Sequence, residues 1–271
     1  MPLEALFLAL AAAVIHAIWN LLLAGARDPQ ATTAVAVPVS ALVCAPLALL
    51  FWHLDAAAWP FIAASFVLEL TYYALLASAY RGAELSVVYP LARGLAPVLV
   101  LAGIVAFTSA STSVHQIVGV LLVAGGVLLV RGLRRGRGVG YGVAIACCIA
   151  GYTIVDKHGV AHASPLAYLE LITAFVGTAY VAGFVAVRGT EPLRAAIGWR
   201  AFVSGVAAFA AYGLVLAALK IASAASVAAV RETSVLVAAA LAAVVLKERV
   251  TRWRLAGAVL VAGGVALLSL A

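Results

Sequence analysis

The segment Leu122-Val123-Ala124-Gly125-Gly126-Val127 recurs unchanged as Leu260-Val261-Ala262-Gly263-Gly264-Val265, at an offset of 138 residues in a chain of 271. The same offset aligns Arg93 with Arg231, and both arginines lie inside apolar runs. Apolar sequence of low complexity can match itself by chance, but a matched arginine inside two such runs is hard to obtain in that way. We therefore interpret the chain as two repeats of one unit.

The composition around these segments indicates a membrane protein. Hydrophobic residues make up 66% of the chain and charged residues 10%, and the mean hydropathy is +1.18, far outside the range of soluble domains. The abundance of Ala, Val, Leu and Gly favours packed helices over a β-barrel, whose strands would alternate polar and apolar residues. The expected fold class is an all-α integral membrane protein, with a multi-pass location in the inner (cytoplasmic) cell membrane.

Ten apolar runs are long enough to cross a bilayer core of roughly 30 Å. Because each repeat then holds five spans, the two repeats enter the membrane in opposite orientations, which predicts two five-helix inverted repeats, as in secondary transporters. The first repeat is residues 1–133, a basic linker follows at 134–138, and the second repeat is 139–271. The first run is expected to be a permanent helix and not a cleaved signal. The runs cover residues 3–25, 31–52, 58–80, 85–106, 114–131, 139–159, 164–187, 200–221, 225–246 and 253–270.

Basic residues are concentrated in the loops that follow spans one, three, five, seven and nine, whereas the loops of the other side carry only Lys157 and Lys220. By the positive-inside rule the richer side is cytoplasmic, so both termini are predicted to lie outside. These loops also account for the formal net charge of +7, so no nucleic-acid partner is expected. The expected partners are the lipid bilayer and a small-molecule substrate, with the chain a monomer or a homodimer.

Several short motifs, taken in their order and spacing, resemble the ten-helix EamA-type members of the drug/metabolite transporter superfamily. They are Ala-Glu-Leu-Ser-Val-Val-Tyr-Pro-Leu-Ala-Arg-Gly at 83–94, Gly-Tyr-Thr-Ile-Val-Asp-Lys at 151–157, and Arg-Glu-Thr-Ser at 231–234 followed by Leu-Lys-Glu-Arg at 246–249. The resemblance implies export or uptake of small metabolites, often amino acids. Carriers of phosphorylated sugars, of cationic drugs or of other metabolites on the same fold are the alternatives.

The two repeat-matched arginines are the foremost candidates for substrate contact. An arginine in mid-span costs about 2.5 to 3.5 kcal/mol on insertion scales and is usually turned toward a cavity or a partner. A guanidinium offers paired donors that suit a carboxylate or a phosphate. The alternative is a structural ion pair, of Arg231 with Glu232 or of Arg93 with Glu69.

Acidic and aromatic residues near the arginines extend this candidate site. Glu69 and Glu232 are expected to receive a substrate ammonium group or to bind a coupling proton, or else to serve as counter-ions of the arginines. Glu232 points about 100° away from Arg231 around a continuous helix, so these two need not pair. Tyr89, four residues before Arg93, shares its face and is expected to close the pocket.

Two polar pairs occupy related positions of the repeat, in a register shifted by two residues. His16 and Asn20 share one helical face, as do Tyr152 and Asp156, so each pair either lines a mouth of a cavity or joins helices. Trp19 is expected in the core or in a cavity wall. The full set of candidate substrate-binding residues is Arg93, Arg231, Glu69, Glu232, Tyr89, Tyr73, His16, Asn20, Trp19, Tyr152, Asp156 and Tyr212.

The predicted function is secondary active transport, most readily export, of a small amphoteric or anionic metabolite, with amino acids as the first class. No catalytic residue, cofactor or metal site is expected; a proton is the coupling ion considered. Direct coupling to ATP is disfavoured because no phosphate-binding Gly-x-x-x-x-Gly-Lys-Ser/Thr loop occurs. A lipid-modifying membrane enzyme is the remote alternative, since the polar groups lie deep and follow the repeat instead of gathering near an interface.

Overall fold

The computed structural model describes residues 1–107, 112–131, 138–245 and 251–270. Within these ranges the chain is helical, apart from loops and one isolated bridge between Leu54 and Ala163. Residues 134–137 of the predicted linker and the motif at 246–249 lie outside the described residues. The helices are α1 (Leu3–Ala24), α2 (Pro29–Leu50), η1 (Ala56–Ala58), α3 (Trp59–Gly82), α4 (Leu85–Phe107), α5 (Val114–Arg131), α6 (Val139–Gly159), α7 (Pro165–Arg188), α8 (Glu191–Ala196), α9 (Trp199–Ile221), α10 (Ala224–Arg231), α11 (Ser234–Val245) and α12 (Arg252–Ser269).

The expectation of an all-α chain with many membrane-spanning helices is confirmed. In the described part of the chain, nine helical segments are long and apolar enough to cross a membrane, and Val114–Val130 is a shorter apolar helix. The run expected at 225–246 is interrupted, because α10 ends at Arg231 and α11 begins at Ser234. There the N–H of Glu232 donates to Ala229 O at 3.1 Å, three residues back, which tightens the turn and ends α10.

Local sequence fixes where several helices begin. Asp28, Ser164, Ser223 and Thr251 each accept a hydrogen bond through the side chain from the N–H three residues later, which satisfies one of the free donors at a helix start. A proline follows Asp28 and Ser164 at the first helical position, where no N–H partner is needed. Both α2 and α7 therefore enter the bundle from sharply ended turns.

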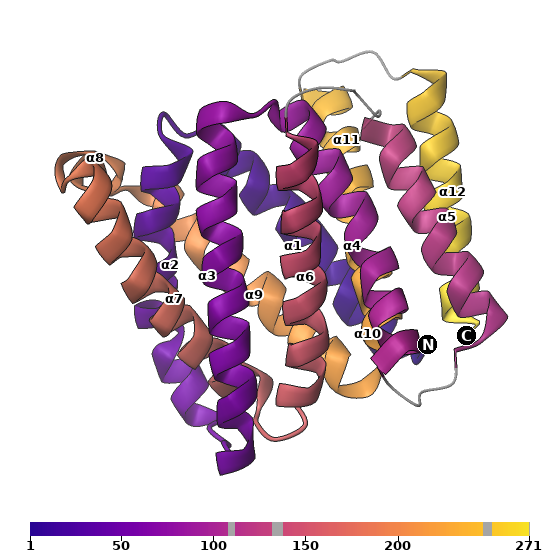
Figure 1. Cartoon of the computed structure of the whole chain (residues 1–271), viewed down its shortest axis with the longest axis horizontal. Helices are drawn as coiled ribbons and strands as arrows, with labels where there is room; N and C mark the ends of the chain where they lie inside the picture. Colours follow the sequence, from indigo (N-terminus) through magenta and orange to yellow (C-terminus); the bar gives the residue numbers. More distant parts are fainter. Residues whose placement is uncertain (108–111, 132–137, 246–250, 271) are drawn as a thin grey trace.

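The helices form one bundle, and both termini lie at its lower edge in Figure 1. The ammonium group of Met1 donates to Leu268 O at 3.1 Å, which ties the start of α1 to the end of α12. We call this the terminal end; it also carries the turns at 51–58 and 160–164. The opposite end, which carries the turn at 25–28 and the segment 189–198 with the short helix α8, is called the basic end.

Several pairs of helices that are distant in the sequence pack against each other. Helix α1 packs on α9 and α3 packs on α6, while α2 packs on α7 and α5 on α12. Helices α5 and α12 approach closely: a Cβ added to Gly126 would lie 2.6 Å from Gly257 O, and one added to Gly257 would lie 2.6 Å from Gly126 O. Gly119 and Gly264 face each other in the same way. Only glycine allows the two backbones to approach this closely.

Candidate functional site

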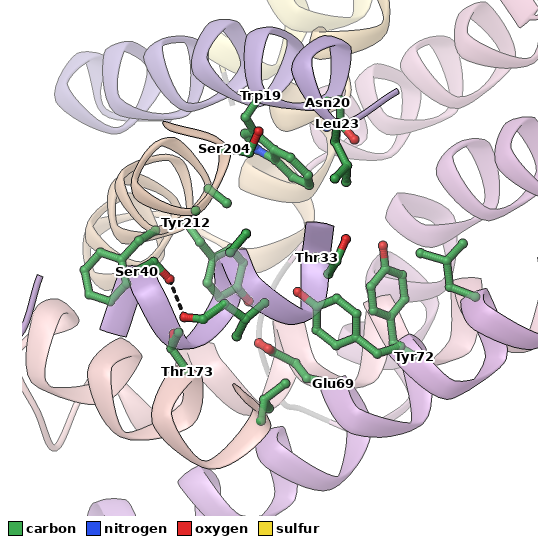
Figure 2. Close-up of a pocket in the computed structure, with 18 of the residues that line it drawn as sticks. Trp19, Asn20, Leu23, Thr33, Ser40, Glu69, Tyr72, Thr173, Ser204 and Tyr212 are labelled. Atoms are coloured by element: carbon green, nitrogen blue, oxygen red, sulfur yellow. Dashed lines mark hydrogen bonds between the residues drawn. The ribbon is translucent and has the colours of Figure 1, made fainter. Parts of the chain in front are cut away.

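A cavity of about 180 Å³ lies inside the bundle and is lined by residues of α1, α2, α3, α4, α6, α7, α9 and the end of α10 (Figure 2). One water needs about 10–15 Å³ on the same measure, so the cavity has room for a small metabolite. Its lining runs from mid-bundle toward the basic end, where Leu23, Gln30 and Tyr180 belong to it. Within the described ranges no residue of the turns 51–58 and 160–164 lines it.

Most of the residues selected from the sequence lie in this cavity wall, and two lie behind it. Glu232 is 1% exposed and Asp156 is 0% exposed, and neither lines the cavity. Their expected direct contact with a substrate is therefore not supported by their positions. The selected residues that do line the cavity are His16, Trp19, Asn20, Glu69, Tyr73, Tyr89, Arg93, Tyr152, Tyr212 and Arg231.

Arg93 from α4 and Arg231 from α10 converge on one carboxylate. The Nη1 atom of Arg93 lies 3.3 Å from Oε1 of Glu232, and Nε of Arg231 lies 3.9 Å from the same oxygen. The structural pairing of Arg93 with Glu69 considered from the sequence does not form. Arg231 and Glu232 do meet, because α10 ends between them and the rotation of 100° per residue no longer separates their side chains.

This cluster has more positive than negative groups. Two guanidinium groups share the single carboxylate of Glu232, and the buried Nε of Arg231 has no hydrogen-bond partner. The Nη2 of Arg93 contacts Nε2 of His16; since a guanidinium can only donate, the ring nitrogen is the acceptor in this contact. An unpaired buried donor of this kind costs about 1–3 kcal/mol.

Glu69 is the acidic group of the cavity itself. Figure 2 shows its side chain pointing from α3 into the cavity, across from Trp19 and Ser204. Among the described residues no ion pair involves Glu69. The carboxylate therefore faces the space that a ligand would fill, on a different helix from the two arginines.

Tyrosine rings form a continuous row along the wall next to Glu69. Tyr180 contacts Tyr73, Tyr73 contacts Tyr72, and Tyr72 contacts Tyr152, with ring centroids 5.3, 5.2 and 6.5 Å apart. Tyr152 in turn meets Tyr212 edge to face at 6.0 Å. Tilted and edge-to-face contacts of this kind hold each ring in place, so the wall is both aromatic and rich in hydroxyl groups.

Asp156 holds this row from behind. It accepts hydrogen bonds from the hydroxyl groups of Tyr168, at 3.0 Å, and of Tyr212. It thereby joins α6, α7 and α9, which is the helix-joining alternative for this residue. In the pair that the sequence predicts to be its counterpart, Asn20 Nδ2 donates to His16 O at 2.7 Å within α1.

Several polar residues of α2 and α7 that line the cavity are not among the candidates predicted from the sequence. Thr33 and Ser40 line the cavity from α2, and Thr173 and Tyr180 line it from α7. Each pair is separated by seven residues, or two helical turns, and so lies on one face. That spacing of polar residues within apolar helices is the signal that would have identified them.

Comparison with known proteins bears on the fold and the family. Residues 136–270 match the model of the EamA-like transporter family. A solved structure titled only "Crystal structure of protein" superposes with a TM-score of 0.80 over 98% of this chain and 98% of that chain, at 15% sequence identity. At this identity the likeness concerns the fold alone. No curated protein matches the chain.

Proposed function

The chain belongs to the EamA-like transporter family through residues 136–270, and from this premise we propose that it is a secondary active exporter of small amphoteric or anionic metabolites, with amino acids as the principal class. The family indicates a membrane transporter of small solutes, which is consistent with the proposal that the chain is not an enzyme. The observation that carries the finer proposal is the placement of Arg93 and Arg231 on one part of the cavity wall and Glu69 on another.

A zwitterion fits this distribution of charge. Its carboxylate would contact the guanidinium groups of Arg93 and Arg231, and its ammonium group would contact Glu69. Glu232 is not available for the amine, because it is 1% exposed and shared by the two arginines. The same distribution disfavours the alternatives: a phosphate dianion would face Glu69, and an organic cation would face two arginines.

The direction of export is supported by the position of the cavity. Its lining extends to the basic end, where Leu23 and Gln30 lie, and the positive-inside rule assigns the end with more basic loops to the cytoplasm. An exporter takes up its substrate from that side. The proposed location is the inner membrane, with both termini outside.

Inverted repeats are the proposed basis of alternating access. In the proposed repeat, α1 corresponds to α6 and α3 corresponds to α9. The contact of α1 with α9 then has its counterpart in the contact of α6 with α3. The offset of 138 residues likewise turns the contact of Gly126 with Gly257 into that of Gly264 with Gly119. Rocking of the two halves about the cavity would then expose it to each side in turn. We propose protons as the coupling ion and Glu69 as their binding group.

Counterflow in proteoliposomes tests the proposal. Purified protein is reconstituted and assayed with labelled amino acids, sugar phosphates and organic cations, each with and without a pH gradient. We expect exchange of at least one amino acid, accelerated by the gradient. Exchange of sugar phosphates or organic cations without any amino acid would reject the proposed substrate class, and indifference to the gradient would reject proton coupling.

A further inference from the structure

Two turns at the terminal end are joined through their main chains. The N–H of Asp55 donates to His162 O at 2.9 Å, and the N–H of Ser164 donates to His53 O at 2.8 Å. Between these bonds, Leu54 and Ala163 form the antiparallel bridge. We call residues 53–55 and 162–164 the loop clasp. It closes the end of the bundle to which the cavity does not extend.

Side chains from three further helices support the loop clasp. The ring of Phe61, in α3, stacks on those of His158 and His162, with centroids 6.1 and 5.9 Å apart. Lys220, at the end of α9, donates to Ala163 O at 3.5 Å. Ala163 itself is 1% exposed. The loop clasp is therefore a packed closure that involves α3, α6, α7 and α9.

The basic end is tied differently. Arg188 pairs with Asp28 at 2.7 Å, and Gln30 Nε2 donates to Ala77 O at 3.0 Å. Arg200 donates to Gly25 O through its guanidinium group. In the described ranges no hydrogen bond joins the main chains of two separate turns at this end. The end toward which the cavity leads is thus held by side chains, which can rearrange without moving the backbone.

A chain of direct contacts connects the loop clasp to the cavity wall. The N–H of Tyr168 donates to Ser164 O at 3.0 Å in the first turn of α7, and the hydroxyl of Tyr168 donates to Asp156. Asp156 also accepts from Tyr212, which lines the cavity. A Cβ on Gly159 would lie 2.4 Å from the ring of Tyr168, so this ring is seated against the backbone of α6 and has little freedom to move independently.

We propose that the loop clasp is the seal of the transport path at the terminal end, and that Asp156 is the positioning residue that ties its closure to Tyr212 in the cavity wall. The inference rests on the proposed transport function. Breaking of the loop clasp would open the cavity to the terminal end, and displacement of Tyr212 by a bound substrate would reach the clasp through Asp156 and Tyr168.

The seal is tested by cross-linking. Residues opposite each other in an antiparallel bridge lie within disulfide range, so Leu54→Cys and Ala163→Cys are combined in a variant whose native Cys44, Cys147 and Cys148 are replaced by alanine. Oxidation is expected to lower counterflow at least tenfold and reduction to restore it, while each single variant transports normally under both conditions. Undiminished counterflow in fully cross-linked protein would overturn the assignment of the seal.

The role of Asp156 is tested without any substrate. Maleimide labelling of Ala163→Cys reports opening of the loop clasp, because this position is 1% exposed when the clasp is closed. Asp156→Ala is expected to raise the labelling rate at least fivefold, and Tyr168→Phe to raise it less, with no change at Arg27→Cys on the basic end. Thr153→Val is the matched control in α6, since its hydroxyl bonds only to Ile149 O of the same helix.

The labelling results distinguish a failure of the proposed role of Asp156 from a failure of the proposed transport function. Equal labelling in Asp156→Ala and Thr153→Val would overturn the role of Asp156, whether or not a substrate is known. An equal rise at both ends of the molecule would mean general loosening and would overturn it as well. Failure of the wild-type protein to exchange any solute would reject the proposed function, while the labelling comparison would still decide whether Asp156 holds the loop clasp closed.

Discussion

Arg93 and Arg231 are held in place by Glu232, and their substitution therefore has two consequences. Each contacts Oε1 of Glu232, whose side chain is 1% exposed. Removal of one partner from a buried ion pair typically costs about 3–5 kcal/mol, because the remaining charge loses its compensation. Here the second arginine stays beside the carboxylate, so a single substitution is expected to weaken the protein without unfolding it.

The arginines should contribute to transport through the geometry of their donors. Arg231→Lys keeps the charge in the cavity wall but removes the planar set of paired guanidinium donors. A hydrogen bond between charged groups contributes about 1.5–3 kcal/mol, so this variant should raise KM for an amino acid about tenfold or more, and Arg93→Ala and Arg231→Ala should reduce transport further. Arg27→Lys, on an exposed loop residue, is the control for charge-preserving replacement. Normal kinetics in all three cavity variants would exclude the proposed acid-binding site.

Asp28 gives a pH-dependent prediction outside the membrane spans. Partial burial alone would raise the pKa of Asp28, but the hydrogen bonds from Arg188 and from the N–H of Ala31 outweigh it and lower the pKa from 3.8. Its contribution to stability is therefore present at neutral pH and is lost as the pH falls below 3.8. Asn is an equally good N-cap, so Asp28→Asn removes mainly the ion pair with Arg188.

The size of this effect is limited by solvent, since the side chains of Arg188 and Asp28 are 36% and 31% exposed. We expect Asp28→Asn to lower the free energy of unfolding by about 0.5 kcal/mol at pH 7. The difference in melting temperature from wild type should shrink as the pH is lowered toward 3. A difference that grows on acidification would contradict the lowered pKa.

Individual site residues could be predicted from the sequence where a charged residue lies within an apolar run. Arg93, Arg231 and Glu69 stand out because a charge in an apolar run needs a partner or a cavity, and all three line the cavity. The position of Glu232 was not predictable, because it depends on where α10 ends. That end is set by three-residue hydrogen bonds and by contacts with Arg93 from a distant part of the chain.

At the scale of helices, the position of a glycine decides whether it permits close packing against a neighbouring helix. In each Gly-Gly pair the second residue faces the other helix or its backbone, as Gly126 and Gly264 do, whereas a Cβ on Gly125 or Gly263 would meet nothing within 4 Å. The repeated segment is the same in both halves, so sequence alone gives these residues no distinguishable roles. Only the helix pairing shows which of them is needed.

Two alanine substitutions should therefore have opposite effects. Gly257→Ala places a Cβ 2.6 Å from Gly126 O and should cost about 1–3 kcal/mol through overpacking of α5 against α12. Gly263→Ala meets no atom and should be neutral or stabilise α12, since alanine is the better helix former by about 1 kcal/mol. Thermal unfolding in detergent measures both. Equal melting temperatures for the two variants would contradict the close contact of α5 and α12.

The membrane spans were predictable because length and apolarity decide them, and their ends agree closely with the helices. The short helix α8 and the break between α10 and α11 were not predicted. Six residues of α8 carry too weak a periodic signal. The break contains no proline or glycine at residues 232–233, so it follows from tertiary contacts and not from local propensity.

At the scale of the whole molecule, the two ends of the bundle bear on its orientation in the membrane. Both termini lie together at the terminal end (Figure 1), joined by the hydrogen bond from Met1 to Leu268 O. The basic end carries Arg27, and the terminal end carries the loop clasp. The positive-inside rule then predicts that Arg27 lies in the cytoplasm and His53 outside.

Labelling of intact cells with a membrane-impermeant maleimide tests this orientation in a background without the native cysteines. His53→Cys should react, because the side chain of His53 is 65% exposed at the terminal end, and the substitution keeps the main-chain oxygen that accepts from Ser164 in the loop clasp. Arg27→Cys should react only after the membrane is permeabilised. The reverse pattern would place the cavity mouth outside, and it would turn the proposed exporter into an importer while leaving the cavity and its charges unchanged.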